Sequence, residues 1–304
     1  MRQLSIGTTV HVRVPASSAN LGPGFDTLGL ALGLYDDLTA EVIAEGLELT
    51  IEGEGADILP RSEKHLVIKA IRLALAEAGV AAPGLKVHCM NRIPQSRGLG
   101  SSASAAVAGV ALGNALAGNV LTQEQVVHLS ATFEGHPDNS SASVLGGFVV
   151  SWTENNDGAT EFKAVSVPPF PGLRATAIVP ETYASTSEVR RVLPASVPHI
   201  DARFNVARCA LLTHAIQHDP ALLVEATRDR LHQGYRAKAL PVTTQWVEKM
   251  RDRGLAAFVS GAGPTALALH VEDFPQDLRE EALAAGLRVM DLDIVDGVQV
   301  TVEK

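Results

Sequence analysis

The sequence predicts an α+β fold in two parts, and three observations lead to this class. Apolar runs with strand and helix periodicity fill the chain, but they do not alternate strictly, as they would in a doubly wound parallel sheet. A length of 304 residues is enough for two domains with sizeable cores. The composition also changes in a proline-rich stretch at residues 168–172. We therefore expect one domain over residues 1–170 and a second over residues 171–304.

The first half is expected to consist of strands with helices packed against them. Strands are predicted at residues 9–14, 38–43, 47–52, 85–92 and 148–153, and helices at residues 64–79, 101–117 and 122–134. In the first of these helices Val67, Ile71 and Ala74 recur on one face, which indicates that this face packs on a sheet. Thr122 and Gln125 have the spacing of a capping box, which marks the start of the third helix.

The second half has several helical patterns in succession before its strands resume. Helices are predicted at residues 203–217, 220–230, 243–253 and 276–285, and strands at residues 174–179, 256–260 and 265–270, with a final strand pair within residues 287–302. Such grouping of helices and strands is again typical of an α+β fold.

Composition and charge narrow the range of partners. With 25 basic and 34 acidic residues the net charge is −9, so we expect no nucleic-acid partner. The first 14 residues lack the uninterrupted apolar segment of a signal peptide. Residues 103–120 are apolar but include Asn114 and Asn119, which favours a buried helix over a membrane span. We therefore expect a cytoplasmic protein with no membrane partner. Cys89 and Cys209 are expected to be reduced core residues.

The segment PQSRGLGSSAS at residues 94–104 leads from a predicted strand into an alanine-rich helix. Gly98 and Gly100 allow close approach of the backbone to an anion, and Ser101, Ser102 and Ser104 fall in the first helical turn, where free amides and the helix dipole favour phosphate. The same residues could instead only close a turn and cap a helix. A Walker loop is excluded because the chain has no Gly-Lys pair. A dinucleotide fingerprint is disfavoured, but not excluded, by the loop that precedes the glycines.

Three further segments carry polar groups beside turns. The stretch PASSANLGPGFDTLGL at residues 15–30 predicts a loop that presents Asn20 and Asp26, and EGHPDN at residues 134–139 crowds carboxylates, an imidazole and an amide together. SGAGPT at residues 260–265 predicts a tight turn between two strands. Each could be ordinary surface or capping polarity, but their grouping beside glycine-rich turns favours a site.

Together these segments resemble the conserved blocks of the GHMP small-molecule kinases, and within that superfamily the chain is similar to the homoserine kinases. STSEVRRVLP and HQGYRAKALP in the second half also resemble homoserine kinase segments, so that the resemblance extends over nearly the full length. It implies an N-terminal domain like the second domain of ribosomal protein S5, a ferredoxin-like C-terminal domain and an active site between them. One departure is SSAS after Asn139, where the family often has VAPA.

The resemblance also implies roles for individual residues, with ATP and Mg²⁺ as cofactors. The loop that would wrap the ATP phosphates consists of Pro94, Gln95, Ser96, Arg97, Gly98, Leu99, Gly100, Ser101, Ser102, Ala103 and Ser104. Ser102 and Glu134 would ligate Mg²⁺, with Ser101 as the alternative if the alignment shifts by one residue.

The implied substrate is L-homoserine, whose side-chain hydroxyl would be phosphorylated. Asp26 with Asn20 would hold the ammonium, Arg190 and Arg236 the carboxylate, and Asn139 would orient the hydroxyl. His136 is expected to line the same pocket.

The catalytic residues are then Asn139, Glu134 and Ser102, with no dedicated base expected and Asp138 as the alternative should one be needed. By analogy we expect a homodimer. Three other interpretations stay open: a related kinase acting on mevalonate or a sugar, a nicotinamide-dependent dehydrogenase using Gly98 and Gly100, and a non-catalytic amino-acid sensor.

Overall fold

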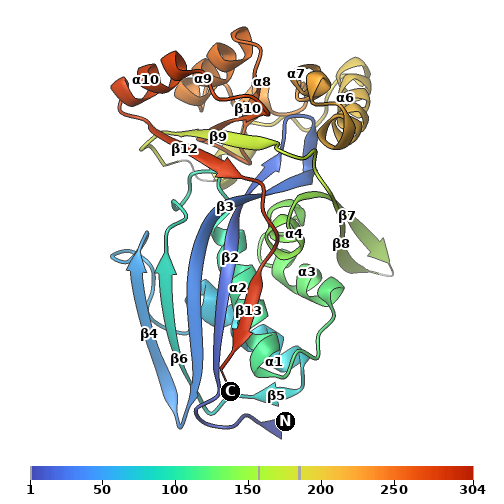
Figure 1. Cartoon of the computed structure of the whole chain (residues 1–304). Helices are drawn as coiled ribbons and strands as arrows, with labels where there is room; N and C mark the ends of the chain where they lie inside the picture. Colours follow the sequence, from blue (N-terminus) through green and yellow to red (C-terminus); the bar gives the residue numbers. More distant parts are fainter. Residues whose placement is uncertain (1, 157, 184–185, 304) are drawn as a thin grey trace.

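The computed structural model describes residues 2–156, 158–183 and 186–303, and it has a large and a small sheet with helices packed on both (Figure 1). The first half comprises β1 (Arg2–Gln3), β2 (Thr9–Asn20), β3 (Gly24–Ile43), β4 (Gly46–Gly53), α1 (Leu66–Glu77), β5 (Val80–Ala81), β6 (Gly84–Asn91), α2 (Ser101–Leu116), α3 (Gln123–Ala131), α4 (Asp138–Leu145), β7 (Phe148–Asn156) and β8 (Ala159–Val167). The second half comprises β9 (Arg174–Val179), α5 (Thr186–Arg191), α6 (His199–His218), the 3₁₀ turn η1 (Pro220–Leu222), α7 (Leu223–Ala226), α8 (Gln233–Arg236), α9 (Pro241–Asp252), β10 (Ala256–Val259), β11 (Ala266–His270), α10 (Gln276–Ala284), β12 (Arg288–Asp293) and β13 (Gln299–Val302).

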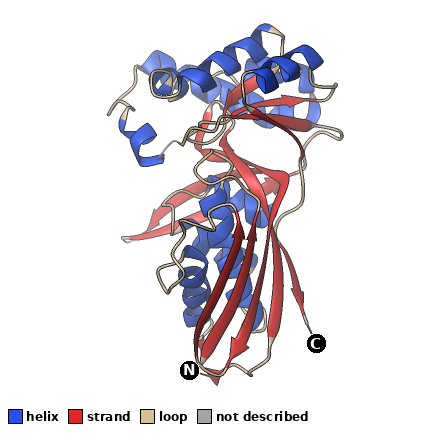
Figure 2. Ribbon diagram, turned by 90° about the vertical axis from the view of Figure 1, so that its left-hand side faces the viewer, coloured by secondary structure: helices blue, strands red, loops and turns tan. Residues whose placement is uncertain are grey.

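The large sheet has the order β13-β2-β3-β6-β4, and β7 joins it through β3 and carries β8. Its strand pairs are antiparallel except for the parallel pair of β4 and β6. Helices α1 and α2 lie on one side of the long strands (Figure 2). Alternate residues of β2, such as Val10 and Val12, form a core with Ile71 of α1 and Val107 of α2. The chain passes from β6 into α2 at the end of the large sheet that lies nearer the small sheet (Figure 1).

The small sheet has the order β10-β11-β9-β12 and is antiparallel throughout. On one face, Trp246 of α9 and Leu278 of α10 pack against its strands. On the other, Leu212 of α6 shares a core with Leu28 and Leu30 of β3. Because this core includes residues of both halves, it fixes the position of one half relative to the other. The predicted α+β class is confirmed.

The hairpin of β2 and β3 differs from the sequence expectation. We predicted a loop over residues 15–30, but both strands continue through this stretch, with Ala16 opposite Leu32 and Ser18 opposite Leu30. One face of these strands packs against the small sheet and the other against α2 and α4, so small and apolar residues follow one another without the polar alternation that indicates a strand. The turn is confined to the tip of the hairpin, where Asn20 and Asp26 lie.

Helix boundaries follow local capping where it exists. Thr122 and Gln125 form the predicted capping box at the start of α3, which ends at Ala131, three residues before the predicted end. The predicted helix at residues 220–230 is wrong beyond Ala226. The carboxylate of Asp229 accepts hydrogen bonds from the backbone amides of residues 231–233 and thereby starts α8 instead.

The last two strands do not pair with each other as predicted. β12 pairs with β9, whereas β13 returns to the large sheet and pairs with β2. An apolar strand pattern sets which face is buried, but it does not choose the partner strand. The boundary at residue 170 stays a prediction; the small sheet begins at β9, and the chain returns to the first half at its end. In the described part of the chain, no helix has the length and apolarity needed to span a bilayer.

Candidate active site

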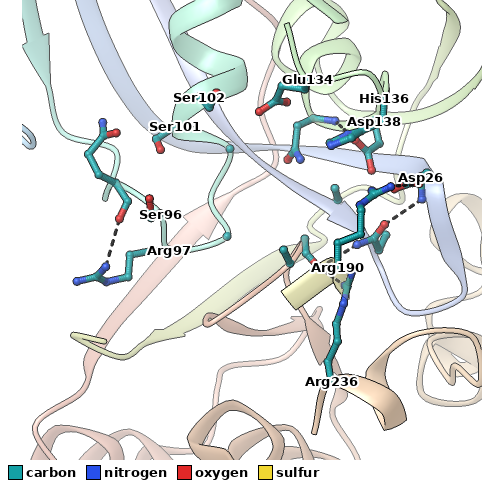
Figure 3. Close-up of a pocket in the computed structure, with 18 residues that line it drawn as sticks. Asp26, Ser96, Arg97, Ser101, Ser102, Glu134, His136, Asp138, Arg190 and Arg236 are labelled. Atoms are coloured by element: carbon teal, nitrogen blue, oxygen red, sulfur yellow. Dashed lines mark hydrogen bonds and ion pairs between the residues drawn. The ribbon is translucent and has the colours of Figure 1, made fainter. Parts of the chain in front are cut away.

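Residues predicted from distant parts of the sequence meet in one cavity between the two sheets (Figure 3). The phosphate-loop residues lie on one side, and Asp26, Arg190 and Arg236 lie on the other; Glu134 lies near Ser102, and His136 lies near Asp26. The predicted residues that line the cavity are Asn20, Asp26, Gln95, Ser96, Arg97, Gly98, Gly100, Ser101, Ser102, Glu134, His136, Asn139, Arg190 and Arg236. The side chains of Leu99, Ala103 and Ser104 are instead fully buried in the core, so these residues can meet a ligand only through their backbone.

The loop after β6 has the backbone that its glycines predict. Gly98 and Gly100 have φ of +74° and +71°, and α2 begins at Ser101. A Cβ on Gly98 would lie 2.4 Å from the carbonyl oxygen of Ser260, and one on Gly100 would lie 2.1 Å from Ser17 Oγ. The hydroxyl of Ser260 also donates to the carbonyl of Gly98, at 2.6 Å. The turn at residues 260–265 therefore holds the glycine loop from the second half.

The amides of this loop are free to bind an anion. Within the described residues, no protein acceptor pairs with the backbone N–H groups from Gln95 to Ala103. These amides include the first turn of α2, where the helix dipole adds to their positive potential. A row of unpaired amides at a helix start is a site for phosphate.

Glu134 lies next to this helix start, in the turn between α3 and α4. Burial raises the pKa of its carboxyl, and the His136 charge and the nearby Ser102 hydroxyl only partly offset this effect. Its Oε2 is buried and has no hydrogen-bond partner within the described chain. A buried, unpartnered carboxylate oxygen beside a hydroxyl is the kind of oxygen pair that Mg²⁺ binds. Ser102 and Glu134 therefore fit a magnesium site.

Asp26 and Arg190 form an ion pair across the other side of the cavity. Arg190 donates from two nitrogens to the two carboxylate oxygens, at 3.0 and 2.5 Å. The Asp26 amide donates to Asn20 Oδ1 at 3.0 Å, and Asn20 Nδ2 donates to the carbonyl of Gly261 at 2.9 Å. Since Asn20 is 4% exposed and uses both ends of its amide, it ties the hairpin tip to the turn at Gly261. Its predicted contact with the substrate ammonium stays a prediction.

Arg236 is 1% exposed and reaches the cavity from α8. It donates to the Gly261 carbonyl at 3.0 Å and contacts His232 Nδ1 at 3.0 Å, and its Nε has no partner in the described chain. Burial, together with the charge of Arg190, lowers the pKa of Arg236 to about 10, so it is still a cation at neutral pH. The Phe25 ring lies 5.4 Å from the Arg190 guanidinium and 5.5 Å from that of Arg236.

His136 forms a second internal ion pair. Its Nδ1 lies 2.7 Å from Asp138 Oδ1, and Asp138 also accepts from the Asn139 amide at 2.8 Å. Burial lowers the pKa of His136, but the hydrogen bond and charge of Asp138 outweigh it and raise the pKa to about 9. The imidazole is therefore protonated at neutral pH and faces the cavity as a cation.

Sequence reasoning missed several residues that shape the site. Phe25, His232 and Gly261 support the arginines, and Ser17 contacts Asn139 at 3.1 Å. Phe25 and His232 stood within recognised segments, but nothing in their spacing indicated that their rings stack at 5.3 Å. Several of these contacts join residues more than a hundred positions apart, such as Ser17 and Asn139 with a separation of 122, and no local pattern encodes them.

A second cavity adjoins the first, and the sequence did not indicate which residues would line it. Gln95, Ser101 and Ser102 line both cavities, so the second begins where the phosphate loop ends. Its other walls are largely apolar: Leu38, Leu59, Pro60, Leu66 and Val67. His65 lies there at 4% exposure, and its Nδ1 lacks a partner within the described residues.

Comparison with known proteins agrees with this geometry. Residues 65–147 match the family model described as GHMP kinases N terminal domain, and residues 211–288 match GHMP kinases C terminal. The chain is 59% identical to the homoserine kinase of Corynebacterium diphtheriae over 304 residues, which is 99% of each chain. The chain belongs to the homoserine kinase family of the GHMP kinases. The homoserine kinase of Corynebacterium glutamicum is 56% identical, again over 99% of both chains.

Solved structures place the fold in the same family. The structure of homoserine kinase from Cytophaga hutchinsonii superposes with a TM-score of 0.85 at 25% identity and covers 98% of both chains. A putative homoserine kinase from Listeria monocytogenes gives a TM-score of 0.73 at 33% identity, over 97% of this chain and 100% of the other. The predicted resemblance is confirmed, and the dehydrogenase alternative is set aside because the sheets are mostly antiparallel.

Proposed function

We propose that the chain transfers the γ-phosphoryl group of ATP to the side-chain hydroxyl of L-homoserine, giving O-phospho-L-homoserine and ADP. One observation carries the proposal: a row of free amides at the start of α2 faces the Asp26–Arg190 pair across a single cavity. The first side suits a polyphosphate and the second a zwitterionic amino acid. The 59% identical relative is named a homoserine kinase, which supports the choice of amino acid.

ATP would occupy both cavities. Its phosphates would lie against the amides of residues 95–103, and its base would enter the adjoining apolar cavity. Burial lowers the pKa of His65 and so favours its neutral ring, and its Nδ1, which is buried without a partner in the described chain, would meet the base once the ring turns toward the cavity. We therefore assign the nucleoside to this second cavity.

Ser102 and Glu134 would hold Mg²⁺ beside the phosphates, because they supply a hydroxyl and an unpartnered carboxylate oxygen. The bound ion would neutralise charge on the phosphate oxygens. Arg97 and the cationic His136 also line this cavity and add positive charge to its wall.

Homoserine would bind by exchanging partners with the internal ion pair. Its ammonium would take Asp26, while its carboxylate would take Arg190 and the free edge of Arg236. The exchange keeps every charge paired, so an acceptor that lacks either group would leave Asp26 or Arg190 without its partner. The pocket thus selects zwitterions.

The chemical step needs alignment more than a base. A bond forms between the homoserine hydroxyl oxygen and the γ-phosphorus, and the bond from that phosphorus to the β,γ-bridging oxygen breaks. The hydroxyl proton passes to a phosphoryl oxygen or to water, since Asp138 is already committed to His136 and to the Asn139 amide. Holding the two reactants in line can contribute about 7 to 11 kcal/mol to lowering the barrier.

An ADP-release assay over several acceptors tests the proposal. We expect turnover with L-homoserine and ATP–Mg²⁺, and little with mevalonate, galactose or a homoserine analogue without its ammonium. Turnover of mevalonate or a sugar but not homoserine would overturn the substrate while leaving a kinase. Binding of homoserine without any ADP formation would instead indicate an amino-acid sensor.

Two further parts of the proposal concern the protein in the cell. We propose a homodimer by analogy with the family, which sedimentation of the purified chain tests directly. We also propose a cytoplasmic location, because ATP and free amino acids are available there, and cell fractionation tests it.

A further inference from the structure

Ser17 lies beneath the phosphate loop and next to Asn139. It belongs to β2 and is 0% exposed, and its backbone amide donates to the carbonyl of Leu99 at 3.1 Å. Its Oγ lies 3.1 Å from Asn139 Oδ1, on the first turn of α4. Ser17 therefore joins the phosphate loop to Asn139, the residue that the family resemblance predicts to orient the hydroxyl.

The direction of this hydrogen bond follows from the neighbouring acceptors. Ser143 is buried beside Ser17, and its own hydroxyl donates to the carbonyl of Pro15 at 3.1 Å. The Ser17 proton then has two acceptors, Asn139 Oδ1 at 3.1 Å and Ser143 Oγ at 3.4 Å. If the side-chain amide of Asn139 were rotated by half a turn, its Nδ2 would donate to Ser17 Oγ. The Ser17 hydroxyl could then donate only to Ser143 Oγ, at the longer distance of 3.4 Å. The shorter bond, with Ser17 donating to Oδ1, satisfies all three groups.

This orientation leaves Asn139 Nδ2 facing the cavity. In the described part of the chain Nδ2 has no protein acceptor, and it is not among the buried atoms that lack a partner. It is therefore exposed to the cavity that Asn139 lines. Gly100 leaves the space for the arrangement, since a Cβ there would lie 3.2 Å from Asn139 Oδ1.

We propose that Ser17 is a positioning residue that fixes the Asn139 amide with its nitrogen toward the transferred phosphoryl group. The inference rests on the proposed phosphoryl transfer. An amide nitrogen only donates, so it can stabilise the negative oxygens of the transition state but cannot take the hydroxyl proton. Turned over, the same side chain would present a carbonyl oxygen to an anion. Ser17 thus decides whether Asn139 assists or opposes the reaction.

Ser17→Ala tests this role through kcat. Removing one aligned donor from a transition state costs about 10² to 10³ in kcat. In Ser17→Ala the Asn139 amide can rotate but is still correctly oriented for part of the time. We therefore expect a smaller loss, a fall in kcat of about 10-fold. KM for ATP and for homoserine should stay within about 2-fold, because neither ground-state contact involves Ser17. In an Asn139→Ala background, adding Ser17→Ala should change kcat by less than about 2-fold.

Ser143→Ala is the matched control. It removes a hydroxyl from the same buried cluster, and this hydroxyl makes no hydrogen bond to Asn139 in the described chain, so the variant should lower the melting temperature as Ser17→Ala does and leave kcat unchanged. Equal kcat losses in Ser17→Ala and Ser143→Ala, or a full Ser17→Ala loss that persists in the Asn139→Ala background, would overturn the inference. So would an unchanged kcat in Ser17→Ala. Failure of the proposed function is distinguished at the outset, because the wild-type chain would then release no ADP with homoserine.

Discussion

The two sides of the cavity differ in how their polar groups are satisfied before a ligand binds. On the nucleotide side, the amides of residues 95–103, Glu134 Oε2 and His65 Nδ1 have no partners within the described chain. On the acceptor side, Asp26 pairs with Arg190, and His136 pairs with Asp138. The nucleotide side therefore holds mostly unmet hydrogen-bonding capacity, whereas on the acceptor side the charges of Asp26 and His136 are paired and Arg236 Nε lacks a partner in the described chain.

This difference separates affinity from selectivity. A hydrogen bond to a charged group contributes about 1.5 to 3 kcal/mol, so a phosphate that accepts from these free amides gains binding energy. On the acceptor side a ligand gains Arg236 but otherwise exchanges one set of ion pairs for another, and this exchange is close to neutral for the right charges and costly for the wrong ones. We infer that the nucleotide side supplies binding energy and that the acceptor side supplies discrimination.

Glu134→Gln should impair Mg²⁺ binding on the nucleotide side, and we expect this variant to have the largest effect on activity. A neutral amide is a poor ligand for Mg²⁺, and we expect kcat to fall by about 10³-fold. The fold should be unaffected or slightly stabilised, because burial disfavours the charge of this carboxylate. Steady-state kinetics and thermal melting measure both, with Glu124→Gln on the exposed start of α3 as control. More than a tenth of wild-type activity would mean that Glu134 is not a metal ligand.

Gly100→Ala tests whether the shape of the loop depends on its glycine. A left-handed φ costs alanine about 1 to 2 kcal/mol, and the clash with Ser17 Oγ at 2.1 Å adds about 1 to 3 kcal/mol. We expect the free energy of unfolding to fall by about 3 kcal/mol, measured by urea denaturation. Gly79→Ala is the matched control, since its φ is +69° and nothing lies within 4 Å of the added Cβ; it should lose about 1 kcal/mol. Equal losses would show that the loop is not tightly packed.

The same contrast explains what the sequence could predict. The nucleotide loop is local: Gly98, Gly100 and Ser101 are neighbours, glycine accepts the left-handed φ that the turn needs, and serine favours a helix start, so both features could be predicted. The capping box at Thr122 was readable for the same reason. Here the sequence pattern and the structure agree because the interactions span only a few residues.

The acceptor side could not be read in this way. Arg190 meets Asp26 across 164 positions, and Asn20 meets Gly261 across 241. Only the resemblance to a family brought these residues together in advance. It could not show that Asn20 is bonded at both ends, or that Ser17 contacts Asn139. The sequence also did not indicate that β2 and β3 continue through residues 15–30, because burial of both faces removes the polar and apolar alternation that marks a strand.

Arg190→Ala should weaken the acceptor side alone. Loss of a charged hydrogen bond costs about 1.5 to 3 kcal/mol, so KM for homoserine should rise about 10- to 100-fold while KM for ATP stays the same. Stability should hardly change, since exposed ion pairs contribute about 0 to 1 kcal/mol. Arg191→Ala, at the exposed next position of α5, is the control. A parallel rise in both KM values would mean that the two sides are not separate.

Tyr183 offers the smallest and most specific test, because it links the two sides. Arg97 of the phosphate loop donates to the carbonyl of Glu181 and lies 3.8 Å from the centre of the Tyr183 ring, shortly before the helix that carries Arg190. A bound phosphate that holds Arg97 should therefore favour the position of Arg190 that receives homoserine.

Tyr183→Ala should reduce this coupling, while Tyr183→Phe should preserve it, since the interaction needs the ring and not the hydroxyl. An exposed cation–π contact is worth about 0.5 to 1 kcal/mol, which corresponds to about a 2- to 5-fold change in a binding constant. We expect a non-hydrolysable ATP analogue to tighten homoserine binding less in Tyr183→Ala than in the wild type, by that factor, in calorimetric titrations. By reciprocity, homoserine must lose the same factor in its effect on the analogue. If Tyr183→Ala and Tyr183→Phe behave alike, the two sides of the cavity bind their ligands independently of this contact.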